Sequence, residues 1–359
     1  MSLTIYAVGD VMLGEQALCY NFGVKSVIKN KGVNYLFKDV KDIFRNGDIV
    51  FGNLEAPISN HTDKNGFEAN FFRAEPNVIE GLKNANFNVL SVANNHIMEH
   101  GDSAFLSTVS SLKENNITPV GVANKTEILE IDGFKIAIIG YSFIDDFIDT
   151  SLYNKINSER KILGDIKSIR DSVDLVILSL HWGYEYIPFP SPEQVEIGRK
   201  LIDCGADIIF GGHPHVIQSY EIYRGKPIVY SLGNFIFDHT YMKSTRKAVI
   251  AKIKVDMNTK DIDIDFIPVV CDSKEYCPKV ADGKDRDEIL NLILSVRGKI
   301  ENKSLSDYRS VVGGYLTFAN RYKRKAKMQM KMQFIKNMYR YPPNLSISMV
   351  NGYLQKRFR

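Results

Sequence analysis

Two histidines separated by a single proline follow a predicted strand end. The apolar run 208–210 leads into a pair of glycines and then into His213-Pro214-His215. Because Pro214 disfavours a helical conformation at His213, we predict an extended segment in which both imidazoles point to the same side. Imidazole is a common neutral metal ligand, and glycine lets the backbone approach an ion closely. The pair is therefore a candidate metal site; the alternative is two turn histidines that bind nothing.

Four other predicted strands also end in residues that can bind a metal. Carboxylate, amide and imidazole side chains all occur among them. Such a mixed set suits Mn, Fe or Zn, whereas an all-oxygen set favours Mg or Ca. We therefore predict one or two divalent ions, Mn, Fe or Zn, where these strands end. The candidate ligands at the four strand ends are Asp10, Glu55, Asn95, His96 and His181.

A sheet must bring these residues together. Apolar runs predict strands over residues 3–9, 48–52, 88–93, 175–180, 208–210 and 227–231. Helical patterns occupy 36–44, 76–84, 101–114, 158–173 and 192–204, and hairpin patterns occur within 119–141 and 248–269. Strands separated by helices indicate parallel pairing, and hairpins indicate antiparallel pairing. We therefore predict a mixed, layered α/β fold rather than a pure Rossmann sheet.

The composition is typical of a soluble globular protein. Of the 359 residues, 44% are hydrophobic and 25% are charged, and the four cysteines are too dispersed to suggest a disulfide framework. The chain begins with a predicted strand and lacks the basic and apolar segments of a signal peptide. No stretch is long and apolar enough to span a bilayer. We therefore expect a cytoplasmic protein, either free or peripheral to the membrane.

The carboxyl-terminal region differs in charge from the rest. Residues 321–359 contain 11 of the 46 Lys and Arg and no Asp or Glu, so residues 1–320 hold 35 basic residues against 42 acidic ones. We predict a domain over 1–272 and a helical, basic extension over 273–359. The extension is a candidate contact for a membrane surface, an acidic polymer or a partner in a synthesis complex. Alternatively, it packs on the domain with its charges solvated. No nucleic-acid motif accompanies the charge.

Six motifs follow one another in the order of a known family. They are GDVMLG, GNLEAPIS, ANNH with Gly101 soon after, LHWGYEY, GGHPHV and YSLGNFIFD. Together they resemble the CapA family of bacterial capsule and poly-γ-glutamate synthesis proteins, which is similar to the calcineurin-like metallophosphoesterases. The resemblance covers roughly residues 3–270. It implies a four-layer α-β-β-α sandwich of the calcineurin-like metallophosphoesterase type, with a two-metal site on one edge.

The resemblance also implies a role for each candidate ligand. Glu55 takes the position of the carboxylate that bridges two metals. His96 takes the position of the general acid that protonates the leaving group. One metal site is completed by Asn95, His181 and His213, and the other contains Asp10 and His215. His239 lies outside this pattern.

Two positions depart from the phosphoesterase pattern. That pattern has a histidine two residues after its first aspartate, where this chain has Met12, and an aspartate at the bridging position, where this chain has Glu55. A thioether does not replace an imidazole for a hard, water-activating ion. We therefore expect the site of Asp10 and His215 to be weak, empty or differently filled.

Residues beside the motifs are candidates for substrate contact. Arg73 can hold a carboxylate or phosphate by two parallel hydrogen bonds, and a surface ion pair is the alternative. Trp182 and Tyr184 can line the pocket or pack in the core. Glu185 is a candidate second base. Asn234 can orient a ligand or the substrate.

These observations predict a metal-dependent hydrolase of the CapA type. It would cleave an amide or ester bond in an anionic polymer, such as poly-γ-glutamate or a related cell-envelope polymer. The first alternative is a phosphoesterase that acts on a small or polymeric phosphate, against which Met12 argues. The second is a non-catalytic accessory component of a polymer-synthesis complex, whose function would survive His96→Ala but not the deletion of residues 321–359.

Overall fold

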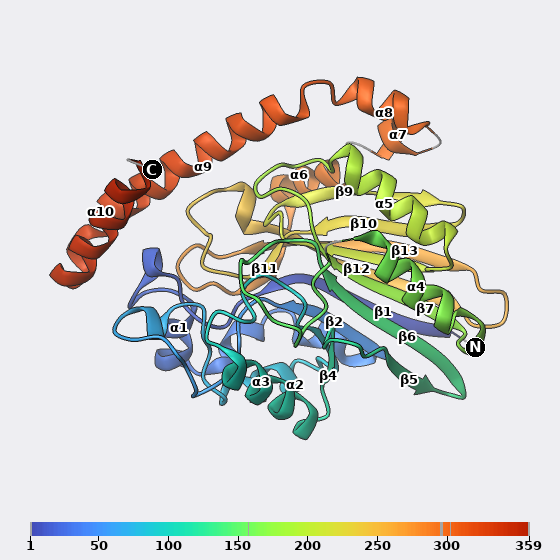
Figure 1. Cartoon of the computed structure of the whole chain (residues 1–359), viewed down its shortest axis with the longest axis horizontal. Helices are drawn as coiled ribbons and strands as arrows, with labels where there is room; N and C mark the ends of the chain where they lie inside the picture. Colours follow the sequence, from blue (N-terminus) through green and yellow to red (C-terminus); the bar gives the residue numbers. More distant parts are fainter. Residues whose placement is uncertain (1, 157, 295–296, 302, 358–359) are drawn as a thin grey trace.

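The computed structural model describes residues 2–156, 158–294, 297–301 and 303–357. Two β-sheets lie face to face, and helices cover their outer faces (Figure 1). Phe51 from one sheet stacks on Phe210 from the other, with ring centroids 5.5 Å apart, so the inner faces pack directly against each other. The architecture confirms the predicted four-layer sandwich.

Both sheets mix parallel and antiparallel strands. The first has the order β14-β13-β12-β1-β2-β3-β4, with β11 paired to β1, and the second has the order β5-β6-β7-β8-β10-β9. The first sheet contains β1 (Ser2–Val11), β2 (Ile49–Leu54), β3 (Val89–Ser91), β4 (Thr118–Val120), β11 (Asn234–Ile236), β12 (Lys247–Asp256), β13 (Ile262–Cys271) and β14 (Pro278–Val280). The second contains β5 (Glu127–Ile131), β6 (Phe134–Ser142), β7 (Leu175–His181), β8 (Ile208–Gly212), β9 (Ile217–Tyr223) and β10 (Lys226–Leu232).

The helices form the two outer layers and the carboxyl-terminal extension. The first sheet is covered by α1 (Val24–Lys31), α2 (Val78–Asn84) and α3 (Asp102–Glu114), and the second by α4 (Glu159–Ile169) and α5 (Pro192–Asp203). The chain then continues through α6 (Gly283–Leu294), α7 (Arg297–Ile300), α8 (Leu305–Val311), α9 (Tyr315–Asn337) and α10 (Pro343–Arg357). In Figure 1, α9 is the long orange helix that runs from α8 to α10.

Strand β7 shows how sequence alternation positions a functional side chain. Leu175 and Ile177 belong to the core between the sheets, whereas Val176 and Leu178 belong to the core under α4 and α5. Residues two apart in a strand share a face. His181 therefore points to the space between the sheets, at the carboxyl end of β7.

A one-residue irregularity in β1 decides where Asp10 points. Ala7 pairs with Phe51 of β2, but the next paired residue of β1 is Asp10, opposite Asn53, so the register shifts by one. Paired residues of neighbouring strands share a face, and Phe51 belongs to the core between the sheets. The bulge therefore turns Asp10 toward the second sheet, beside Asn53.

Some elements differ from those predicted. The segment 36–44 forms no α-helix; its two ends belong to the 3₁₀ helices η2 (Val33–Phe37) and η3 (Lys41–Asn46), which a turn connects. Within the predicted helical extension, Gly314 adopts a φ of 76° and separates α8 from α9. Strands β9, β11 and β14 were not predicted. The residues of β9, 217–223, follow the histidine motif almost directly, so they were not recognised as a separate strand, and β11 and β14 are only three residues long.

The carboxyl-terminal extension begins in contact with the sandwich. Strand β14 pairs with β13, and Ile289 and Ile293 of α6 belong to the core between the sheets. The division of the chain at residue 272 stays a prediction. Among the residues that the structure describes, no helix is both long and apolar enough to cross a membrane.

Candidate metal centre

Two groups of three potential ligands share one carboxylate. The first group is Glu55, His181 and His213, and the second is Asp10, Glu55 and His215. Within each group the ligand atoms lie within 4.8 Å of one another. All five residues are buried. They come from the ends of β1, β2, β7 and β8, where the two sheets face each other, so both groups could hold a metal ion.

The unpartnered atoms in these groups fit a divalent ion. Among the described residues, Oε1 of Glu55 and Nδ1 of His213 are buried without a hydrogen-bond partner. Nε2 of His181 lies 3.6 Å from Oε1 of Glu55, and Nε2 of His215 lies 3.9 Å from it. These separations exceed good hydrogen bonds, and leaving buried polar atoms unsatisfied costs about 1–3 kcal/mol each. A cation between the atoms would satisfy them.

The electrostatics of the two groups also favour a cation. Burial and then the charge of Asp10 raise the pKa of Glu55, with a further contribution from Glu185. Burial and then the neighbouring imidazoles lower the pKa of His181. The imidazole is thus held in its neutral form, which has a free lone pair, and the crowded carboxylates gain from a nearby positive ion.

The His-Pro-His segment reaches the centre by a different geometry from the one predicted. His213 has a φ of 91° and His215 a φ of 58°, so the predicted extended conformation is wrong. The carbonyl of Pro214 accepts a hydrogen bond from the backbone N–H of Tyr186 at 2.8 Å, which fixes the turn. The two ring centroids lie 5.9 Å apart, and one ring enters each ligand group.

The Asn-Asn-His motif borders the same carboxylate. Oδ1 of Asn95 lies 2.8 Å from Nε2 of His181. Nε2 of His96 lies 3.9 Å from Oε1 of Glu55, and its Nδ1 lies 2.5 Å from Oε1 of Glu99. The ring of His96 stacks on Phe72, with centroids 4.1 Å apart. His96 is therefore held on both sides with Nε2 directed at the centre.

Three contributing residues were missed in the sequence. Nδ2 of Asn53 lies 2.9 Å from Asp10 and 3.2 Å from His181, and Glu99 holds His96. Asn53 precedes Glu55 by two residues in a strand, so strand periodicity could have revealed it. His239 is buried, and its ring centroid lies 4.8 Å from that of His215, although sequence placed it outside the motif.

Asn234 brings a polar side chain to the second group, whereas Met12 brings an apolar one. Asn234, on β11 beside Asp10, has its Oδ1 2.9 Å from Nδ1 of His215 and so orients that ring. Met12 is fully buried and packs against Ala56 and Phe237. The second group therefore has an apolar thioether neighbour in place of a further imidazole.

The comparison with known proteins identifies the family. Residues 4–239 match the family described as bacterial capsule synthesis protein PGA_cap. The chain belongs to this family. All five residues of the two ligand groups lie within the matched range.

Relatives of this PGA_cap chain carry names from capsule synthesis. The capsule biosynthesis protein CapA of Bacillus anthracis is 32% identical over 282 residues, which cover 73% of this chain and 66% of the relative. The PGA biosynthesis protein CapA of Bacillus subtilis strain 168 is 31% identical over 265 residues, which cover 68% of this chain and 65% of the relative. The chain thus spans about two thirds of the length of each.

A solved structure shares the fold of this PGA_cap chain. A phosphatase from Mycoplasma pneumoniae aligns with a TM-score of 0.50 and 16% identity, over 77% of this chain and 96% of the phosphatase. At this identity the likeness concerns the fold alone. It agrees with the metallophosphoesterase-like sandwich described above.

The predicted substrate contacts have different surroundings in the PGA_cap fold. Trp182 is only 1% exposed and donates a hydrogen bond to the carbonyl of Tyr230, so it packs in the core, which is the alternative that the sequence left open. Arg73 donates to the carbonyls of Ala69 and Ser59, so its guanidinium supports the loop. Tyr184 is 38% exposed on the segment after His181. Glu185 lies on the same segment, and its negative charge contributes to the raised pKa of Glu55.

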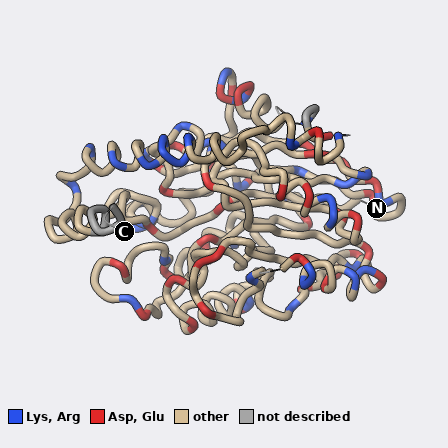
Figure 2. Tube along the Cα trace, turned by 45° about the horizontal axis from the view of Figure 1, so that its top comes forward, with Lys and Arg blue, Asp and Glu red and all other residues tan. Residues whose placement is uncertain are grey.

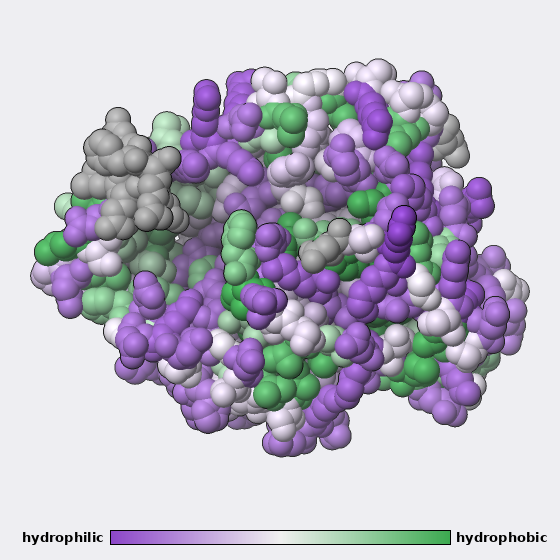
Figure 3. Space-filling model, viewed as in Figure 1, coloured by the Kyte–Doolittle hydropathy of each residue, from purple (hydrophilic) through white to green (hydrophobic). Residues whose placement is uncertain are grey.

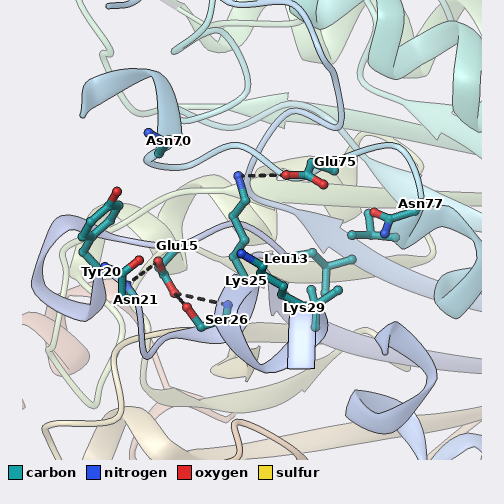
Figure 4. Close-up of a pocket in the computed structure, with 12 residues that line it drawn as sticks. Leu13, Glu15, Tyr20, Asn21, Lys25, Ser26, Lys29, Asn70, Glu75 and Asn77 are labelled. Carbon is teal, nitrogen blue, oxygen red and sulfur yellow. Dashed lines mark hydrogen bonds and ion pairs between the residues drawn. The ribbon is translucent and has the colours of Figure 1, made fainter. Parts of the chain in front are cut away.

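A separate cavity of about 500 Å³ lies between α1 and the segment 70–78. Figure 4 shows Lys25 of α1 paired with Glu75 across it, at 3.3 Å, and Glu15 bound to Ser26. None of the predicted site residues lines this cavity. It is therefore distinct from the metal centre of this PGA_cap chain.

Proposed function

We propose that this PGA_cap chain is a divalent-metal-dependent hydrolase that cleaves an amide or ester bond in an anionic polymer such as poly-γ-glutamate. The main support is the arrangement around Glu55. Its unpartnered Oε1 faces the Nε2 atoms of His96, His181 and His215 at 3.6–3.9 Å. The names of the Bacillus relatives support a role in capsule synthesis and an acidic polymer as substrate.

Glu55 would bridge two ions in this scheme. His181 and His213 would complete one site with Asn95, and Asp10 and His215 would form the other. When bound, a divalent ion would supply Lewis-acid activation of a water molecule and of the scissile carbonyl. Mn, Fe or Zn would suit these nitrogen and oxygen donors.

His96 would act as the general acid. Glu99 accepts a hydrogen bond from Nδ1–H. Although burial raises the pKa of Glu99, the hydrogen bond and charge of His96 lower it overall. A carboxylate at Nδ1 stabilises the imidazolium, which then has a proton to donate from Nε2. In hydrolysis, a water oxygen bonds to the carbonyl carbon and gives up one proton to the solvent, the bond to the leaving nitrogen or oxygen breaks, and that atom takes the proton from His96, which the solvent then reprotonates.

Metal content tests the first part of the proposal. Elemental mass spectrometry should find Mn, Fe or Zn bound stoichiometrically to the wild-type chain after reconstitution. His213→Ala should lower the metal content by most of one ion per chain. It removes an imidazole ligand whose Nδ1 has no hydrogen-bond partner among the described residues. His61→Ala is the matched control, since His61 is exposed, and should leave the content unchanged. If the wild-type chain binds no metal after reconstitution, the proposal of a metal-dependent hydrolase is overturned.

Activity tests the second part. The metal-loaded chain should shorten poly-γ-glutamate, as measured by size-exclusion chromatography. His96→Ala should slow this by about 100-fold or more, and Glu99→Gln by a smaller factor, with metal content retained. Hydrolysis of chromogenic phosphates instead of the polymer would favour a phosphoesterase. Metal binding without either activity would favour an accessory role.

An accessory role is the second candidate, because the extension exposes apolar and basic residues together. Lys and Arg recur along α9 (Figure 2), while Met332, Ile335 and Tyr339 are largely exposed among them. Apolar residues gather at the end formed by α9 and α10 (Figure 3), beside an apolar cavity of about 360 Å³ lined by residues such as Phe334 and Met349. Contact with a membrane surface or a synthesis complex through this region stays a prediction.

A further inference from the structure

Helix α9 packs on the segment that carries the metal centre, although it lies outside the range matched by the family. Ala326 of α9 is 1% exposed and packs in one cluster with Tyr186 and Met242. Tyr186 holds Pro214 through its backbone, and its ring centroid lies 6.1 Å from that of His215. The helix is thus joined to the metal centre through one layer of side chains.

Lys323 lies one turn before Ala326, on the same side of α9. Its Nζ lies 5.3 Å from the ring centroid of Tyr184, which follows His181 by three residues. Tyr184 in turn packs against Tyr315 at the start of α9, with centroids 5.8 Å apart. The ammonium is therefore held over an aromatic ring at the rim of the centre.

The charge of Lys323 is available to a ligand. Its side chain is exposed, and in the described part of the chain it forms no ion pair. An unpaired cation so close to a catalytic centre can bind an anionic group of a substrate.

The centre itself needs such a cation to receive an anionic polymer. Asp10 and Glu55 belong to its ligand groups, Glu99 holds His96, and Glu185 lies on the segment that follows His181. These carboxylates repel an anionic chain. The ammonium of Lys323, on the outer side of the rim, offsets that repulsion. It attracts the carboxylates of the polymer to a position away from Glu185.

We propose that Lys323 is a specificity residue that binds a carboxylate of the substrate next to the scissile bond. This inference rests on the proposed function and adds to it a subsite supplied by the extension. Tyr184 serves as the platform of this subsite, and α9 sets its distance from the metal centre.

Binding of a fluorescein-labelled γ-glutamate oligomer to the metal-loaded chain, measured by fluorescence anisotropy, tests the subsite. Lys323→Ala should weaken the affinity about fivefold to tenfold, and Lys323→Glu should weaken it further. Lys325→Ala is the matched control, because Lys325 is also exposed and lies about 200° around α9 from Lys323. It should change the affinity less than about twofold, and metal content should be the same in all variants.

The outcomes separate the subsite from the proposed function. If the wild-type chain binds the oligomer and Lys323→Ala binds it equally well, the subsite is overturned while the hydrolase stands. Equal losses in the Lys323 and Lys325 variants also overturn it, because they indicate unspecific attraction to a basic helix. If the wild-type chain does not bind the oligomer, both the proposed polymer class and the subsite are overturned.

Discussion

Single side chains make the two ligand groups unequal. His181 and His213 both face Glu55 in the first group, whereas the second group has only His215 beside Asp10 and Glu55. Met12, two residues after Asp10, is fully buried against Ala56 and Phe237, and the ring centroid of Phe237 lies 4.8 Å from that of His215. The first group therefore offers two imidazoles to an ion, and the second offers one.

Met12→His should strengthen binding at the second group. The imidazole would add a nitrogen donor where the thioether now lies, and a neutral imidazole suits Mn, Fe and Zn. We expect the affinity for a second equivalent of Zn or Mn to rise by about tenfold, measured by isothermal titration calorimetry. Met12→Leu, which keeps the apolar volume, is the control and should titrate like the wild-type chain. An unchanged second affinity in Met12→His would show that position 12 does not face the ion.

At the scale of elements, the bulge of β1 and its contact with β11 place Asp10. The backbone N–H of Asp10 donates to the carbonyl of Gly233 at 3.0 Å, and Asp10 pairs with Asn234 of β11. A Cβ on Gly9 would lie 1.8 Å from that same carbonyl oxygen. Only glycine allows this approach, so the bulge depends on residue 9.

Gly9→Ala should therefore destabilise the protein and weaken the second ligand group. The added methyl group must push β11 away, which we expect to cost about 2 kcal/mol or more of unfolding free energy. Urea denaturation measures this loss, and metal titration should show weaker binding at Asp10. Gly164→Ala on α4 is the matched control, because a Cβ there meets nothing within 4 Å, and it should be neutral or stabilising by up to about 1 kcal/mol. Equal stability of the two variants would contradict the role given to the bulge.

At the scale of the whole molecule, the sandwich buries several imidazoles near one another. Burial is the main cause that lowers the pKa of His181, His213 and His239 below the ordinary value of 6.5. His215 behaves oppositely, since the hydrogen bond and charge of Asp10 raise its pKa against the effect of burial. These three imidazoles thus resist protonation in the folded chain, and His215 favours it.

The metal-free chain should lose stability as the pH falls below about 6.5. Unfolded histidines take up protons in this range while the three buried ones do not, so protons favour the unfolded state. Each such group contributes at most about 1.4 kcal/mol per pH unit, and the groups whose pKa is raised, His215, Glu55 and Asp238, offset part of the sum. Thermal unfolding in a chelating buffer from pH 8 to pH 5 should show the falling Tm.

His239→Phe is the internal control for this pH dependence. It removes one buried imidazole that belongs to neither ligand group, so the fall in Tm between pH 7 and pH 5 should become smaller. An equal change of Tm with pH in His239→Phe and in the wild-type chain would contradict the assignment of a neutral, buried imidazole at position 239.

The sequence by itself determined the layered fold and most of the residues that meet at the centre. Apolar strand runs ending in Asp10, Glu55, His181 and His213 are local patterns, and parallel strands bring their carboxyl ends to one edge whatever the detailed geometry. These features depend on periodicity and residue type, which are legible in a single chain.

Only the tertiary structure decided the geometry between distant segments. The bulge that turns Asp10 inward depends on β11, more than 220 residues away in the chain. The left-handed backbone at His213 and His215 depends on contact with Tyr186, and the burial of Trp182 on its stack with Tyr230. The approach of α9 to the centre follows likewise from packing between segments. Such contacts leave no local pattern, because each residue's surroundings are supplied by another part of the fold.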